Sequence, residues 1–191
     1  LKVVLLESGG MTGDAKTQSL YQGARVGSPY ITLESSRLRY LGGSSNHWGG
    51  WCRPLDAIDF EERAWLPHSG WPITKADIDR YFVKAHEMCE AGTLYYDGAA
   101  KITGQIGQPL ALGQGGITTR WFQFSKMRSS VLPTHFGDRY APDLKKVSKL
   151  AVYLWANVTR LGLNGAGTAI HELTVATLNG KRFTVKPKIV V

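Results

Sequence analysis

The hydrophobic positions near both ends of the chain follow the pattern of β-strands. Residues 1–6 (LKVVLL) form a short apolar, β-branched run that ends at Glu7, as in a parallel-sheet strand buried on both faces. Three later runs are rich in β-branched and aromatic residues: 151–158, 169–178 and 182–191. Asn179-Gly180 separates the last two runs. Because Asn-Gly is typical of a hairpin turn, the pattern predicts a β-meander here.

The clearest helical pattern begins after Thr74. Thr74 and Asp77 have the spacing of a capping box,. Apolar residues then recur at helical spacing: Ile78, Tyr81, Phe82, Ala85, Met88 and Cys89,. Gly92 is typical of a helix C-terminus, so we predict one amphipathic helix of about four turns. The remaining patterns predict short helices over 16–21 and 136–146 and strands over 36–41 and 118–125.

The segment GGSSNHWGGW (residues 42–51) contains four glycines and has no helical or strand period. Such a run predicts a loop whose backbone takes unusual φ values or closely approaches another group. Its glycine N–H groups and the hydroxyls of Ser44 and Ser45 suit an anionic or polar ligand. From the residues alone, a structural loop with His47 hydrogen-bonded in the interior is an equally good interpretation.

Other candidate chemistry is sparse. The five histidines stand at unrelated spacings, and Cys52 and Cys89 form no CxxC pair, so the sequence predicts no metal site. There is no GxSxG motif of a serine hydrolase,. The six tryptophans, at 48, 51, 65, 71, 121 and 155, leave two interpretations open, because indole rings either stack on sugars or fill a core.

Composition and charge narrow the function classes. The chain has 191 residues, of which 43% are hydrophobic, and a formal net charge of +8. This apolar share excludes a disordered chain. The basic residues are scattered and match no nucleic-acid-binding module, so we expect no nucleic-acid partner. No apolar run approaches the roughly 18 residues of a membrane span. Because both ends lie in apolar runs, we expect a segment of a longer chain.

Four segments, taken in order, resemble the glucose-methanol-choline family of flavin oxidoreductases. The family's second strand, with its ribose-binding acid, is similar to LKVVLLESGG, and its flavin-embracing loop is similar to RYLGGSSNHWGG. The start of its substrate region is similar to SGWPITKADIDRYFVKAHEM. The run into the strand beside the adenine is similar to PTHFGDRYAPDL followed by AVYLWANVTRL. The match covers nearly the whole chain.

The resemblance implies an α/β fold. Its parts are a doubly wound, Rossmann-like FAD-binding sheet with a β-meander, and an inserted α+β substrate region. Residues 1–53 and 143–191 are assigned to the FAD-binding part, and residues 54–142 to the substrate region.

The resemblance also implies an FAD site. Glu7 is assigned to the adenosine ribose and the backbone of Val158 to the adenine edge, although a solvated acid before a turn is the better interpretation of Glu7 from the strand alone. The loop residues assigned to the cofactor are Gly42, Gly43, Ser44, Ser45, Asn46, His47 and Trp48. A His-Trp pair resembles the sugar-oxidising branch, including pyranose oxidase, in which the histidine can be joined to the flavin 8α-methyl. His47 is therefore a candidate site for covalent flavin attachment.

The activity implied is hydride transfer from the CH–OH group of a sugar or glycoside to flavin N5, while a base removes the hydroxyl proton. The glycine fingerprint and the catalytic histidine, with its Asn or His partner, are expected outside these residues, so no catalytic residue is assigned. The expected partners are a small alcohol or sugar substrate and the remainder of the enzyme chain. The alternative is a non-catalytic carbohydrate-binding or structural module on the same scaffold.

Overall fold

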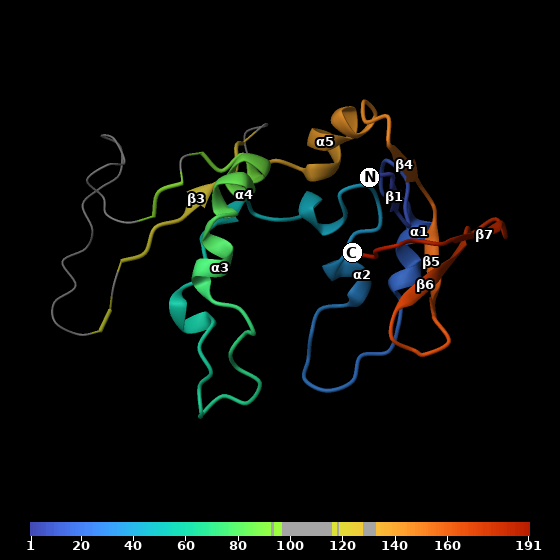
Figure 1. Ribbon diagram of the computed structural model, residues 1–191. Coiled ribbons are helices and arrows are strands. Elements are labelled where there is room, and N and C mark those ends of the chain that lie inside the picture. Colours follow the sequence, from blue (N-terminus) through green and yellow to red (C-terminus); the bar gives the residue numbers. More distant parts are fainter. Residues whose placement is uncertain (93, 97–115, 118, 128–132) are drawn as a thin grey trace. The chain divides into compact units, whose positions relative to one another are not determined.

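The computed structural model describes residues 1–92, 94–96, 116–117, 119–127 and 133–191. Contacts divide the chain into two compact units: unit 1 comprises Leu1–Trp48 and His135–Val191, and unit 2 comprises Gly49–Thr134. The fold is mixed α/β, with small parallel and antiparallel sheets (Figure 1). A doubly wound FAD-binding sheet stays a prediction. No described helix is long and apolar enough to cross a membrane.

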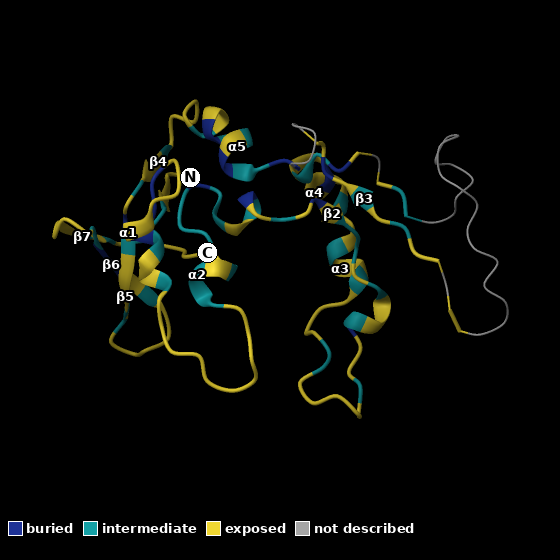
Figure 2. Cartoon of the chain, turned by 180° about the vertical axis from the view of Figure 1, so that it is seen from behind, coloured by how far each residue is buried: buried dark blue, intermediate teal, exposed yellow. Residues whose placement is uncertain are grey.

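Unit 1 contains the predicted parallel strand. β1 (Val3–Leu6) pairs in parallel with β4 (Leu150–Tyr153). The expected burial on both faces is wrong, because Val3, Val4 and Leu5 are 49%, 44% and 37% exposed (Figure 2). This sheet has two strands among the described residues. The described elements therefore leave these side chains partly uncovered, unlike those of a strand in a large parallel sheet.

The predicted β-meander is confirmed. It is an antiparallel sheet of β5 (Asn157–Leu163), β6 (Ile170–Ala176) and β7 (Arg182–Val185), in that order. Leu173 and Val175 of the central strand are buried. At the predicted turn, Gly180 has a φ of +86°, and its N–H donates to the carbonyl of Thr177 at 3.0 Å. Only a residue that tolerates positive φ serves this turn well.

The end of β1 is tied by its backbone to the connection between β4 and β5. The N–H of Glu7 donates to the carbonyl of Tyr153 at 2.9 Å, and the carbonyl of Glu7 accepts from the N–H of Ala156 at 2.8 Å. Between these two partners, Trp155 has a φ of +53°. The chain turns at this point, so the strand predicted over 151–158 is divided between β4 and β5.

Two glycines after Glu7 allow other segments to approach the chain closely. A Cβ on Gly9 would lie 1.9 Å from the carbonyl oxygen of Arg39, and a Cβ on Gly10 would lie 2.7 Å from the Trp155 ring. Gly10 also forms an isolated parallel bridge with Tyr40. Any side chain at either glycine would force these segments apart, so the packing of unit 1 depends on the two missing Cβ atoms.

The helices and 3₁₀ turns described in unit 1 are α1 (Ala15–Gln18), η1 (Ser19–Tyr21), α2 (Leu33–Ser36), η2 (Gly43–Asn46) and α5 (Phe136–Leu144). The helices predicted over 16–21 and 136–146 are confirmed. The strand predicted over 36–41 is wrong, since only Tyr40 forms a β-bridge. The side-chain amide of Gln18 instead bonds to the carbonyl of Arg37 and the N–H of Arg39, groups that a strand would pair with its neighbour,.

The elements described in unit 2 are β2 (Trp51–Cys52), η3 (Ala57–Asp59), α3 (Lys75–Asp79), α4 (Phe82–Cys89) and β3 (Gln123–Phe124). β2 and β3 pair antiparallel. The strand predicted over 118–125 is reduced to β3, and residue 118 lies outside the described residues.

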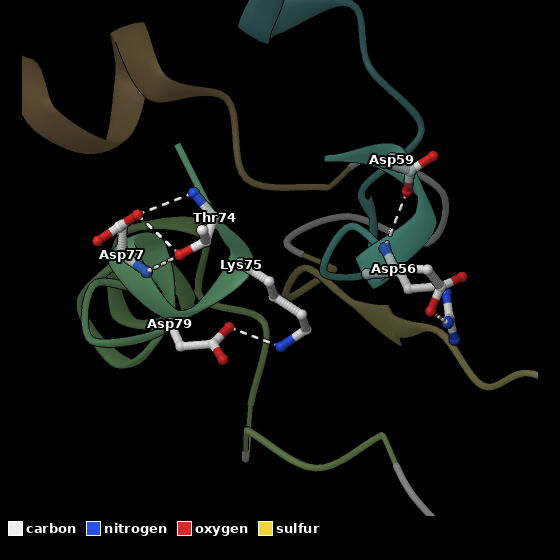
Figure 3. Close-up of polar contacts among 7 residues, drawn as sticks. Asp56, Asp59, Thr74, Lys75, Asp77 and Asp79 are labelled. Carbon is white, nitrogen blue, oxygen red and sulfur yellow. Dashed lines mark hydrogen bonds and ion pairs between the residues drawn. The ribbon is translucent and has the colours of Figure 1, made fainter. Parts of the chain in front are cut away.

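The capping box at Thr74 is confirmed. The N–H of Thr74 donates to Asp77 Oδ2 at 2.8 Å, and the N–H of Asp77 donates to Thr74 Oγ1 at 3.4 Å (Figure 3). The bonds from Thr74 lower the pKa of Asp77. The single four-turn helix predicted here is wrong, because α3 ends at Asp79 and α4 begins at Phe82. The N–H of Tyr81 donates to the carbonyl of Ile78, three residues earlier, at 2.9 Å. This spacing is that of a 3₁₀ turn, whereas an α-helix bonds residues four apart.

A substitution at Gly9 tests the close approach of the segments in unit 1. Gly9→Ala places a Cβ against backbone that cannot rotate away, so we expect a loss of about 1–3 kcal/mol in the free energy of unfolding. The matched control is Gly165→Ala, where a Cβ meets no atom within 4 Å, and we expect a change within about 0.5 kcal/mol. Urea unfolding of both variants measures the difference. Equal stability would contradict the described packing.

Candidate functional site

The residues predicted to bind FAD all belong to unit 1. They lie on three segments: the end of β1 with Glu7, the loop at 42–48, and the start of β5 with Val158. Backbone bonds join these segments around Gly10, whose carbonyl accepts from the N–H of Leu41 at 2.9 Å. The structure therefore brings into one unit three segments that are far apart in the sequence.

Glu7 stands where β1 ends, and its carboxylate is oriented by the turn that follows. Oε1 accepts from the N–H of Gly9 at 2.7 Å and from the hydroxyl of Ser8 at 3.3 Å. Among the described residues, no hydrogen bond is made to Oε2. A half-buried carboxylate with one oxygen held by the backbone still has acceptor capacity for a ligand hydroxyl,.

The glycine-rich loop has the unusual backbone that its sequence predicts. Gly42 and Gly43 have φ values of +95° and +51°, a region that favours glycine. The prediction of no helix is corrected at Gly43–Asn46, which forms one 3₁₀ turn. A Cβ on Gly42 would lie 2.4 Å from the nitrogen of Gly137. The loop therefore packs directly against the first turn of α5.

Asn46 fastens this loop to α5. Its side chain is buried, with 8% exposed. Nδ2 donates to the carbonyl of Leu41 at 2.9 Å, and Oδ1 accepts from the N–H of Gly137 at 3.2 Å. Both ends of the amide thus satisfy buried backbone groups. Gly137 was not among the predicted site residues. The available signal was a glycine in the first turn of a predicted helix, where alanine suits a helix better.

His47 and Trp48 differ in their surroundings. His47 is exposed, and its imidazole makes no hydrogen bond with any described residue, so the interpretation of a histidine hydrogen-bonded in the interior is wrong. Trp48 is half-buried and packs edge-to-face on Phe136, with ring centroids 6.0 Å apart. Of the two serines, Ser44 is exposed, whereas the Ser45 hydroxyl donates to the carbonyl of Gly42 at 2.5 Å. The ring of Trp48 fixes the loop, while the His47 imidazole is accessible.

Arg39 is a cationic group near these segments that the sequence analysis did not select. Its guanidinium carbon lies 4.2 Å from the Tyr21 ring centroid, and Nη1 donates to Asn157 Oδ1 at 3.0 Å. Nε is buried and has no hydrogen-bond partner among the described residues. The bond to Asn157 connects the segment before the glycine-rich loop to the residue before Val158.

A second group of reactive side chains lies in unit 2. His86 is 7% exposed, and its Nε2 is 2.6 Å from the hydroxyl of Tyr96. Burial, followed by the nearby thiols of Cys52 and Cys89, raises the pKa of Tyr96 to about 12. Burial and the neighbouring Cys89 raise the pKa of Cys52 to about 11. Sequence spacing gave no signal for this group, because the members come from separate elements.

No cluster of three or more His, Cys, Asp or Glu side chains suited to a metal ion occurs among the described residues. A hollow in the loop of unit 1 that follows η1 contains none of the predicted cofactor residues. Its lining consists of Gly23, Arg25, Gly27, Ser28, Pro29 and Tyr30.

Removing the Asn46 amide tests its role in holding the loop. In Asn46→Ala, the carbonyl of Leu41 and the N–H of Gly137 lose their partners, and we expect a loss of about 1–3 kcal/mol in the free energy of unfolding. His47→Ala is the control from the same loop, because that side chain is exposed and makes no hydrogen bond with any described residue, and we expect a change within about 0.5 kcal/mol. Chemical denaturation measures both values. An Asn46→Ala protein as stable as the control would exclude the bridging role.

The comparisons with known proteins do not assign the chain to a family: neither the scan against protein-family models nor the search of curated proteins gave a match.

Proposed function

We propose that the chain is part of an FAD-dependent oxidoreductase of the glucose-methanol-choline type, acting on the CH–OH group of a sugar or glycoside. The observation that carries the proposal is the position of Glu7. This acid follows a strand that pairs in parallel, and its carbonyl is bonded to Ala156. Parallel α/β folds bind dinucleotides beyond the carboxyl ends of their strands.

The surroundings of Glu7 fit the adenosine end of FAD. The ribose of a dinucleotide offers hydroxyl donors, and Oε2 of Glu7 is an acceptor that no described residue uses. Val158 lies two residues after Ala156, in β5, directly after the connection to which Glu7 is bonded. The backbone of Val158 is our candidate for the contact with the adenine edge.

The glycine-rich loop fits the remaining part of the cofactor. Asn46 and Trp48 hold it against α5, and a loop held in this way presents its groups to a ligand at little cost in conformational entropy. His47 is exposed and is our candidate for covalent attachment to the flavin. When bound, FAD would supply the hydride acceptor, and the residues of this chain would bind and orient it.

A second candidate function, non-catalytic carbohydrate binding, is favoured by an aromatic cluster in unit 2. Trp51 is 64% exposed, and its ring contacts Phe122 and Phe124 edge-to-face, with centroids 5.6 Å and 5.2 Å away. Exposed rings of this kind stack on sugar faces. This function predicts saturable sugar binding by a protein without flavin absorbance.

The absorption spectrum of the purified full-length protein distinguishes the two functions, and Glu7→Gln tests the site. We expect flavin bands in the natural protein. A charge-assisted hydrogen bond contributes about 1.5–3 kcal/mol, so the variant should bind FAD roughly 10–100-fold more weakly. Glu34→Gln makes the same chemical change elsewhere in unit 1 and should leave affinity unchanged. Absent flavin bands together with no binding of added FAD would contradict the proposal. Equal affinities of the two variants would remove Glu7 from the site.

Acid precipitation of the full-length protein tests the role of His47. If His47 holds the flavin covalently, the flavin stays with the precipitate, and in His47→Ala it is released into the supernatant. His68→Ala is the control, since His68 belongs to unit 2, and its flavin should precipitate with the protein. Free flavin in the supernatant of the natural protein would exclude covalent attachment without excluding bound FAD.

A further inference from the structure

Unit 2 brings together the two cysteines of the chain, which lie far apart in the sequence. Cys52 is the last residue of β2, and Cys89 is the last residue of α4. The Cys89 thiol is near enough to Cys52 to contribute, after burial, to the raised pKa of the Cys52 thiol. Both thiols are free and half-buried. Cys52 and Cys89 are called the cysteine pair from here on.

Backbone hydrogen bonds hold both members of the cysteine pair to one short stretch of chain. The N–H of Ser125 donates to the carbonyl of Gly50, just before β2 begins, at 2.7 Å. The N–H of the next residue, Lys126, donates to the carbonyl of Glu90 at 2.9 Å, just after α4. Cys52 itself pairs with Gln123 of β3, so the ends of β2 and α4 are both bonded to residues 123–126.

We propose that the cysteine pair is a reversible redox modification site, in which Cys52 and Cys89 form an intramolecular disulfide on reaction with a low-molecular-weight disulfide. The folded chain has already bonded the elements that carry the two cysteines to one short stretch, residues 123–126. No third ligand for a metal accompanies them among the described residues. The pair is therefore suited to dithiol chemistry rather than to metal binding.

The reaction is a pair of thiol–disulfide exchanges. One thiolate of the pair attacks the oxidant, and the S–S bond of the oxidant breaks to release one small thiol. The second cysteine then loses its proton and attacks the mixed disulfide, releasing the second small thiol. Two protein thiols are oxidised to one disulfide, and the oxidant takes up the two electrons and two protons as two thiols.

The order of the two exchanges follows from the surroundings of Cys52. Because burial and Cys89 raise the pKa of Cys52 to about 11, this thiol is protonated at neutral pH and is a poor attacking group. Cys89 accordingly makes the first attack and carries the mixed disulfide. The bond that forms ties β2 to the end of α4 and restricts the unfolded chain between them.

Peptide mapping of the full-length protein tests the proposal. The protein is incubated with oxidised glutathione, and the remaining thiols are blocked with N-ethylmaleimide. The masses of the tryptic peptides are then measured by mass spectrometry. We expect the peptides 40–63 and 85–101, which contain the two cysteines, to be joined in a species that dithiothreitol separates. Maleimide adducts on both cysteines, or glutathione on both, would overturn the proposal.

Single-cysteine variants are the matched controls. Cys52→Ser leaves Cys89 able to take one glutathione, and Cys89→Ser removes the residue that attacks first. In the natural protein, oxidation should raise the midpoint of thermal unfolding by about 5–15 °C, and in both variants it should not. An equal rise in the variants, or none in the natural protein, would contradict a bond between the two positions.

Discussion

Unit 1 depends on one steric constraint, the absence of a Cβ at Gly9 and Gly10. At these positions the chain passes the carbonyl of Arg39 and the ring of Trp155 at distances that no other residue allows. This close packing determines where the carboxylate of Glu7 lies. Oε1 of Glu7 accepts from the N–H of Gly9, and the carbonyl of the same glycine accepts from the N–H of Trp155. The candidate ribose acceptor is therefore positioned by backbone packing.

Features set by local chemistry were predictable from the sequence. The capping box at Thr74, the hairpin turn at Gly180 and the positive φ of Gly42 each depend on a few adjacent residues. The strand burial, by contrast, depends on which elements cover β1, and periodicity carries no information about that. The interruptions between α3 and α4 and at Trp155 also lie within runs whose apolar spacing continues unbroken.

The candidate site also combines features that the local sequence predicts with features that it does not. Glycines and small polar residues predicted a loop with unusual φ values, and Gly42 and Gly43 adopt positive φ. The bridge from Asn46 to Gly137 joins positions 91 residues apart, so no local pattern identifies the amide as a structural group. The two cysteines of unit 2 likewise belong to separate segments, which bond to the same stretch of residues 123–126.

The N–H of Gly137 has a further consequence. It belongs to the first turn of α5, where amides have no partner within the helix, yet its acceptor is Oδ1 of Asn46 in the glycine-rich loop. This amide can exchange with solvent deuterium only when the loop releases it. Its protection factor therefore reports the opening of the loop rather than the fraying of the helix, and a ligand that closes the loop would slow exchange at a residue it does not touch.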